Sequence, residues 1–137
     1  MPGNAAPIFT RVGDVQWALA LTAANTAKDG TGTVATVFTA DATNGGYVAY
    51  ILCMPLGTNV SSVARLFINN GSVNTTAANN SMLQGVTLPS SALTETLEQT
   101  AMRIPVNMTL PPGYKLNVVL GTAVAAGWQF TAVGGKY

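Results

Sequence analysis

The chain has 137 residues, of which 48% are hydrophobic and 8% are charged, and its net charge is +1. This length suits one domain with its own hydrophobic core, and the hydrophobicity excludes an intrinsically disordered chain. The absence of any apolar run near ~18 residues argues against a membrane-spanning helix, and the wide spacing of Lys and Arg argues against direct nucleic-acid binding.

The low charge bears on how the surface is used, because an ordinary soluble domain is ~25% charged. A free monomer usually needs a more charged surface to stay soluble. We therefore expect partner proteins to cover part of the surface. The alternative is that the abundant Thr and Asn side chains supply enough hydration by themselves.

Residues 1–14 have no sustained periodicity and contain Pro2, Gly3 and Pro7. We expect them to form an extended N-terminal arm, followed by a single β-sandwich domain over residues 15–137; a disordered terminus is the alternative. The first residues lack the basic and apolar segments of a secretion signal, so no signal peptide is expected. The candidate protein contacts in the arm are Ile8, Phe9, Arg11 and Val12.

Short segments with apolar residues at period two, or rich in β-branched residues, follow the arm, separated by turns of Gly, Asn and Pro. They cover residues 15–21, 33–39, 47–54, 60–68, 82–88, 104–110, 116–120 and 128–133. Such spacing predicts an all-β fold, a two-sheet antiparallel sandwich of about eight strands that is jelly-roll-like. An immunoglobulin-like sandwich is the alternative, although its Cys–Trp–Cys pattern is absent. In the first segment we expect Val15, Trp17, Leu19 and Leu21 to face inward.

Two segments have unusual outer faces. Residues 47–54 are apolar on both faces, which indicates a central strand or an outer face that meets another subunit. In residues 60–68, Ala64 and Leu66 are expected inward. The outward set is Val63, Arg65 and Phe67, which we take as further candidate protein contacts. A lone arginine stacked on the surface is the alternative reading of Arg65.

Two connections also stand out. Residues 69–80 form the longest polar stretch, which predicts either a contact loop or an ordinary long sandwich connection. Ser91 and Glu95 predict a capped helical turn over residues 90–95. Neither segment carries a recognisable chemical motif.

The side chains that most enzymes need are sparse. The sequence has no histidine and five scattered carboxylates, and its single Cys53 lies in an apolar run. We expect no catalytic, metal-binding or cofactor-binding residues, and no enzymatic activity. Because Trp17 and Trp128 fall on the apolar phase of their segments, we expect them in the core. Carbohydrate binding through exposed aromatic residues stays an alternative.

Several motifs in the second part of the chain are similar to those of a known group of proteins. They are residues 56–60 (LGTNV), 65–71 (RLFINNG), 110–116 (LPPGYKL), 120–128 (LGTAVAAGW) and 132–137 (AVGGKY). Together they resemble small structural proteins of tailed bacteriophages, in particular head decoration or cement proteins. The resemblance covers about residues 56–137, while the first 55 residues share only the strand pattern.

This resemblance implies a non-enzymatic virion protein that binds the outer capsid surface and stabilises contacts between capsomers. Its partners would be the major capsid protein and neighbouring copies of itself, in a homotrimer or homodimer, with no direct nucleic acid and no membrane. It would be made in the host cytoplasm without a signal peptide. The alternative is a tail, baseplate or fibre-head subunit with a carbohydrate-binding or receptor-binding role.

Overall fold

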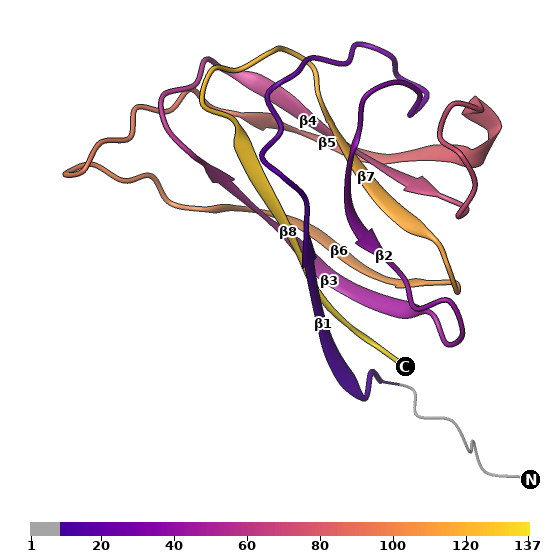
Figure 1. Cartoon of the computed structure of the whole chain (residues 1–137). Helices are drawn as coiled ribbons and strands as arrows, with labels where there is room; N and C mark the ends of the chain where they lie inside the picture. The colour runs from indigo at the N-terminus through magenta and orange to yellow at the C-terminus, as the bar shows by residue number, and fades with distance from the viewer. Residues whose placement is uncertain (1–8) are drawn as a thin grey trace, which may run out of the picture.

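The computed structural model describes residues 9–137, which fold into two antiparallel sheets of four strands each (Figure 1). The strands are β1 (Val12–Trp17), β2 (Ala35–Thr39), β3 (Gly46–Pro55), β4 (Ser62–Asn69), β5 (Asn80–Leu88), β6 (Met102–Leu110), β7 (Lys115–Leu120) and β8 (Trp128–Lys136). Sheet A has the order β1-β8-β3-β6, and sheet B has the order β2-β7-β4-β5. Apart from β4 to β5, every connection crosses between the sheets, which is jelly-roll topology. The predicted fold class is confirmed.

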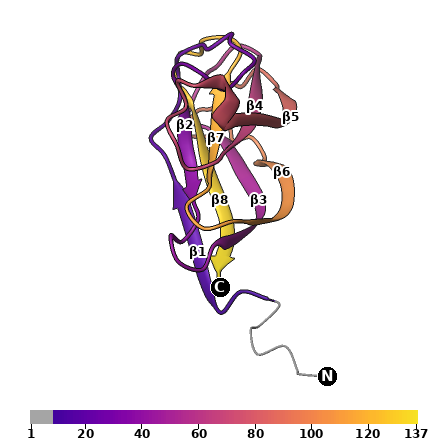
Figure 2. The same cartoon turned by 90° about the vertical axis from the view of Figure 1, so that its right-hand side faces the viewer.

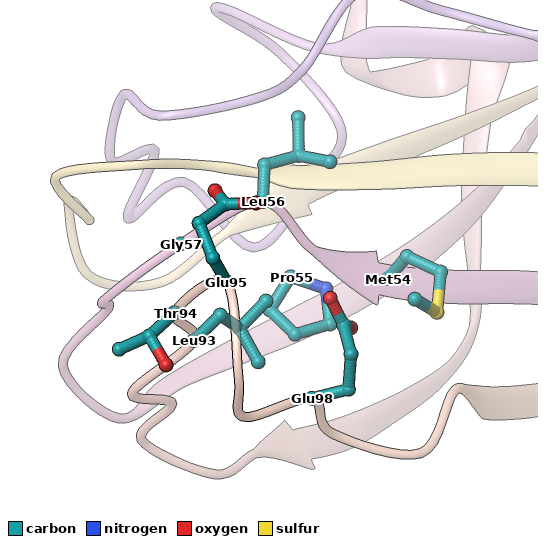
Figure 3. A pocket seen from close by; sticks show the side chains of 8 residues that line it. All are labelled: Met54, Pro55, Leu56, Gly57, Leu93, Thr94, Glu95 and Glu98. Atoms are coloured by element: carbon teal, nitrogen blue, oxygen red, sulfur yellow. The ribbon is translucent and has the colours of Figure 1, made fainter.

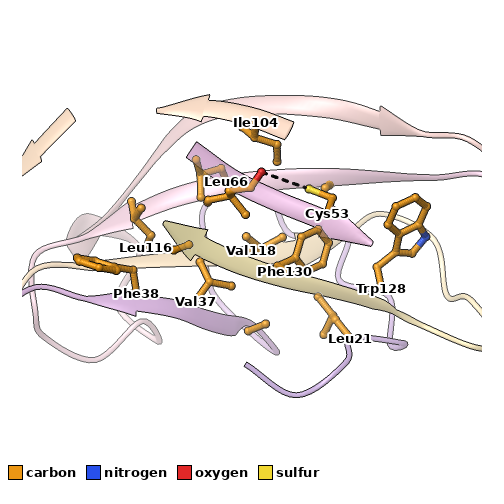
Figure 4. Packing of buried hydrophobic residues seen from close by; sticks show 14 of the residues in the cluster. Leu21, Val37, Phe38, Cys53, Leu66, Ile104, Leu116, Val118, Trp128 and Phe130 are labelled. Carbon is orange, nitrogen blue, oxygen red and sulfur yellow. Dashed lines mark hydrogen bonds between the residues drawn. The ribbon is translucent and has the colours of Figure 1, made fainter. Parts of the chain in front are cut away.

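The hydrophobic core lies between the two sheets (Figure 4). Trp128 and Phe130 of β8 are almost completely buried, as the alternation of residues 128–133 predicts. Phe38 of β2 and Leu66 of β4 belong to the same buried cluster from the side of sheet B. The core is therefore built mainly from the inner faces of the strands, which is the arrangement expected of a two-sheet sandwich.

A β-bulge in β3 changes which of its residues face the core. The pairing of β3 with both neighbours shifts between Val48 and Tyr50. Val48 and Ile51 consequently both lie in the core, although strict alternation would place them on opposite faces. Beyond the bulge, Tyr50 and Leu52 point away from the core. β3 is flanked by β8 and β6, so residues 47–54 do form a central strand.

The start of the sandwich differs from the prediction. β1 begins at Val12, so residues 12–14, which we assigned to the arm, belong to sheet A. The expected inward face is also wrong for three of its four residues: Val15 and Trp17 lie on the outer face, where they are 50% and 64% exposed, and Leu19 after the strand is 92% exposed. The reason is that β1 is an edge strand whose other face carries Gln16, which bonds to sheet B. Leu21 is buried, as predicted. Figures 1 and 2 show the C-terminus near the start of β1.

The predicted helical turn over residues 90–95 is also wrong. That segment contains bridges and turns, and Ser91 is tied to Asn59 by two backbone hydrogen bonds of 2.9 and 3.0 Å. The one helical element among residues 9–137 is a 3-10 helix, η1 (Ala77–Asn79), in the long polar loop. The β-bridge between Ser91 and Asn59 is therefore favoured over the helix cap that Ser91 could form locally.

Candidate functional site

The outer face of sheet A carries a continuous row of apolar side chains. Val15 of β1 pairs with Val133 of β8, which pairs in turn with Tyr50 of β3. Trp17 and Leu52 lie two residues further along their strands, on either side of Thr131. Directly paired residues point to the same face. We call this surface the sheet A patch, and its members are Val15, Trp17, Tyr50, Leu52, Met54 and Val133.

The sheet A patch is accessible and almost uncharged. Trp17 is mostly exposed and Val15 is half exposed, while the other four members are half-buried. The charged side chain beside it is Arg103 of β6, whose guanidinium carbon lies 4.5 Å from the ring centre of Tyr50. At this distance the cation is attracted to the face of the ring. An apolar sheet face of this kind, with a polar rim, is typical of protein contact surfaces.

A hollow of about 380 Å³ lies at the end of β3, next to Met54. Figure 3 shows it between Pro55 and Leu56 on one side and the segment around Leu93 on the other. Glu95 and Glu98 also line it, and both are exposed to solvent. The hollow extends the apolar surface of sheet A and supplies carboxylates at its end.

The arm residues that the structure describes lie at the opposite end of sheet A. Phe9 is 72% exposed and, with Tyr47 and Tyr137, lines a hollow of about 260 Å³. The backbone nitrogen of Arg11 donates to the Lys136 oxygen at 3.0 Å, which joins this segment to β8. Val12 is 53% exposed at the start of β1. Ile8 lies outside the described residues.

The other predicted contacts lie on sheet B, far from this surface in the fold. Val63, Arg65 and Phe67 have the outward phase that the sequence predicts, since Ala64 and Leu66 are in the core. The prediction that Phe67 is a contact residue is wrong, however, because its side chain is 0% exposed. Val63 and Arg65 are half-buried. The seven predicted contact residues therefore do not form one site.

Two loops lie beside the same face of sheet B, next to the cross-strand partner of Phe67. Asn74 donates its side-chain amide to the backbone oxygens of Gly30 and Gly32, at 3.2 and 2.9 Å. Residues 72–75 and Val34 border a hollow of about 300 Å³ whose wall includes Asn117, the cross-strand partner of Phe67. The long polar loop thus binds to its own domain beside this face, as an ordinary sandwich connection does.

Arg65 has an unusual environment on sheet B. One of its guanidinium nitrogens, Nη1, is buried and has no hydrogen-bond partner within residues 9–137. A methyl group on the neighbouring Gly121 would lie 3.2 Å from that nitrogen, so the glycine leaves room for the arginine. Arg65 therefore packs against its own sheet, which is the alternative reading of this residue.

The titratable groups offer little chemistry. Burial raises the pKa of the Cys53 thiol from 9.0 to about 12, which keeps it protonated and unreactive. Hydrogen bonds from the side chain and backbone of Thr31 lower the pKa of Asp29. Over residues 9–137, no three His, Cys, Asp or Glu side chains gather in a way that would hold a metal ion. The described part of the chain also has no helix long and apolar enough to cross a membrane.

Trp17, Tyr50, Leu52 and Met54 are the contact candidates that sequence reasoning missed. A signal for Tyr50, Leu52 and Met54 was present in the sequence, because residues 47–54 have a second apolar face. Trp17 had no such signal, because its alternation with polar neighbours is equally typical of a core residue. The chain matches no protein-family model, no curated protein and no solved structure.

Proposed function

We propose that this chain is a non-enzymatic structural protein of a tailed-phage virion, a decoration protein that binds the outer surface of the capsid. It binds the major capsid protein and adds buried area across the joints between capsomers. The phage assignment rests on the resemblance of residues 56–137. The binding mode rests on the shape and chemistry of sheet A.

The observation that carries the proposal is the sheet A patch. A free monomer rarely exposes a contiguous apolar surface of this kind, and such surfaces mark sites of association. Trp and Tyr at the centre of an interface also account for much of its binding energy. Leu52, on the central strand β3, lies between Tyr50 and Met54 of the patch. Covering the patch would remove Trp17 and Leu52 from water and favour attachment.

The proposal is tested first by location and then by substitution. Virions are separated into tail-free heads and tails, and the protein is quantified in each fraction; we expect many copies on heads. Binding of purified protein to heads that lack it is then compared for wild type and Leu52→Glu. A glutamate at the patch should abolish binding, because its carboxylate would be buried at the interface without a partner to offset the loss of hydration.

The matched control is Val63→Glu, which places the same charge on a half-buried valine of sheet B. We expect this variant to bind heads as wild type does. Recovery of the protein only with tails would overturn the decoration role. Equal head binding by Leu52→Glu and wild type would show that sheet A is not the attachment face.

A second candidate function is supported by the exposure of Trp17. Exposed tryptophan rings on a sheet face stack on sugar rings in carbohydrate-binding proteins, and Trp17 is 64% exposed beside Thr131 and Gln129 of β8. A tail or fibre-head subunit would use such a platform to bind host glycans. Binding to a glycan array that is lost in Trp17→Ala would favour this function. Absence of binding to any glycan on the array would contradict it.

A further inference from the structure

β1 is an edge strand with an accessible surface. It pairs with β8 on one side, and no other strand of the described chain pairs with its second side. An edge strand leaves alternate N–H and C=O groups free to pair with another chain. β1 is also the most exposed strand of the sandwich, with no fully buried residue. Its sequence, VGDVQW, contains no Pro, Lys or Arg, the residues that commonly protect edges.

The other three edge strands are protected. The Gln16 side chain bonds to the backbone of β2 at Thr39, through both N–H and C=O. β6 contains Arg103 and Pro105, and the Pro105 oxygen accepts a hydrogen bond from Gln84 at 2.7 Å. β5 carries an irregularity in its pairing with β4, between the partners of Leu66 and Phe67. β1 is thus the edge left open for pairing.

The outer face of β1 is complementary to itself. Gly13, Val15 and Trp17 share this face at spacings of two residues. No atom of residues 9–137 lies within 4 Å of where a Gly13 side chain would be, whereas Trp17 projects into solvent. In an antiparallel pair centred on Val15, each Trp17 lies opposite the Gly13 of the other copy. Aromatic side chains cover cross-strand glycines in this way and stabilise the pair.

Charge selects this register over the nearest alternative. Centring the pair on Asp14 would set two carboxylates directly opposite each other, which is destabilising. Centring it on Val15 sets Asp14 opposite Gln16, an amide. Both registers keep five residues of each β1 paired, so the length of the pairing does not separate them. With a net charge of +1, whole-chain repulsion between two copies is small.

We propose that the occupant of this edge is a second copy of the chain, and that two copies pair through β1 in antiparallel fashion with Val15 on the two-fold axis. The axis runs perpendicular to the sheet, so the interface is isologous. Two A sheets then join into one continuous sheet of eight strands. Both copies of the sheet A patch face the same side and form one larger apolar surface. The pairing is a property of the free protein and does not depend on the proposed virion role.

The test uses opposite charges at the position predicted to meet itself. Val15→Lys and Val15→Glu are each measured by sedimentation velocity over a wide concentration range, alone and mixed. Wild type is expected to have twice the mass of one chain at high concentration. Each variant alone should be monomeric, because like charges face each other across the axis. The equimolar mixture should recover the dimer, because Lys then faces Glu.

A control variant separates pairing of the strand edges from stacking of the sheet faces. Leu52→Lys changes the part of the sheet A patch on β3 but not β1, and it should dimerise as wild type does. Circular dichroism confirms that each variant is folded, which is expected because Val15 is half exposed. Wild type that stays monomeric at all concentrations overturns the proposal. So do dimers formed by both single variants, or loss of the dimer in Leu52→Lys alone.

A cross-link gives a second readout that does not depend on destabilising the dimer. Val15→Cys should be joined to itself by a short bis-maleimide reagent, giving a covalent dimer on a denaturing gel. The native Cys53 is buried and does not interfere. Thr87→Cys, on the exposed surface of the β5 edge, is the matched control and should stay uncross-linked. Equal cross-linking at both positions would contradict pairing through β1.

Discussion

The side-chain amide of Gln16 forms two hydrogen bonds with the backbone of Thr39. Its Nε2 donates to the Thr39 oxygen and its Oε1 accepts from the Thr39 nitrogen, both at 2.9 Å. Gln16 belongs to the edge of sheet A and Thr39 to the edge of sheet B. The glutamine amide thus pairs with the free backbone edge of β2 as a neighbouring strand would. It also joins the two sheets along one side. Gln84 makes a single comparable bond to Pro105 on the other side, at 2.7 Å.

Gln16→Ala should lower the free energy of unfolding by about 1–2 kcal/mol, since its two hydrogen bonds to Thr39 and its bond to Asp14 at 3.1 Å are all lost. Gln84→Ala, which removes one bond, should cost about half as much. Urea denaturation followed by circular dichroism measures both. If Gln84→Ala proves the more damaging, the Gln16 bonds do not hold the sheets together as described.

Truncation of the two tryptophans to alanine should have very different effects on the free energy of unfolding. Trp17→Ala should change the free energy of unfolding by no more than about 0.5 kcal/mol in dilute solution, because the ring is mostly exposed. Trp128→Ala should cost about 3–5 kcal/mol, because its ring is 0% exposed. Thermal and urea denaturation of the two variants gives the comparison. A large loss in Trp17→Ala would mean that this ring packs on its own domain.

Phe67 should behave as a packing residue and not as a contact residue. Phe67→Ala should lower the free energy of unfolding by about 3–5 kcal/mol, because the removed ring leaves a cavity under the loops beside sheet B. Val63→Ala, on the same face but half-buried, should cost less than about 1 kcal/mol. The same denaturation measurements apply. Similar small losses in both variants would place Phe67 on an open surface.

Cys53 should be unreactive in the native protein. Its pKa is raised by burial from 9.0 to about 12, so at pH 8 a thiol reagent should modify it only after unfolding in urea. The exposed cysteine of Thr87→Cys should react at once and serves as the control. Rapid labelling of native wild type would contradict the burial of this thiol.

The same shift predicts how stability depends on pH. The contribution of Cys53 is fully present below pH 9.0 and is lost as the pH rises toward about 12, because the unfolded thiol ionises first. The free energy of unfolding should therefore fall more steeply above pH 9 in wild type than in Cys53→Ala. Parallel pH profiles for the two proteins would show that the thiol is not shielded from solvent.

The sequence alone determined the all-β class, the number of strands and the core of the C-terminal strands. Residues 104–110, 116–120 and 128–133 alternate cleanly between turn residues, and period-two patterning is a local signal. Phe130 and Leu116 are accordingly buried where the pattern puts them. The two apolar faces of residues 47–54 are likewise a local signal, and they indicated a central strand.

The tertiary structure alone decided which outer faces are open. Val15 and Trp17 read as core residues, yet β1 became an edge strand whose Gln16 bonds to sheet B. Phe67 read as a surface residue, yet loops from elsewhere in the chain lie beside it. Alternation tells which residues share a face, but covering a face depends on segments distant in sequence. For this reason the contact surface that we propose lies on sheet A and not on sheet B.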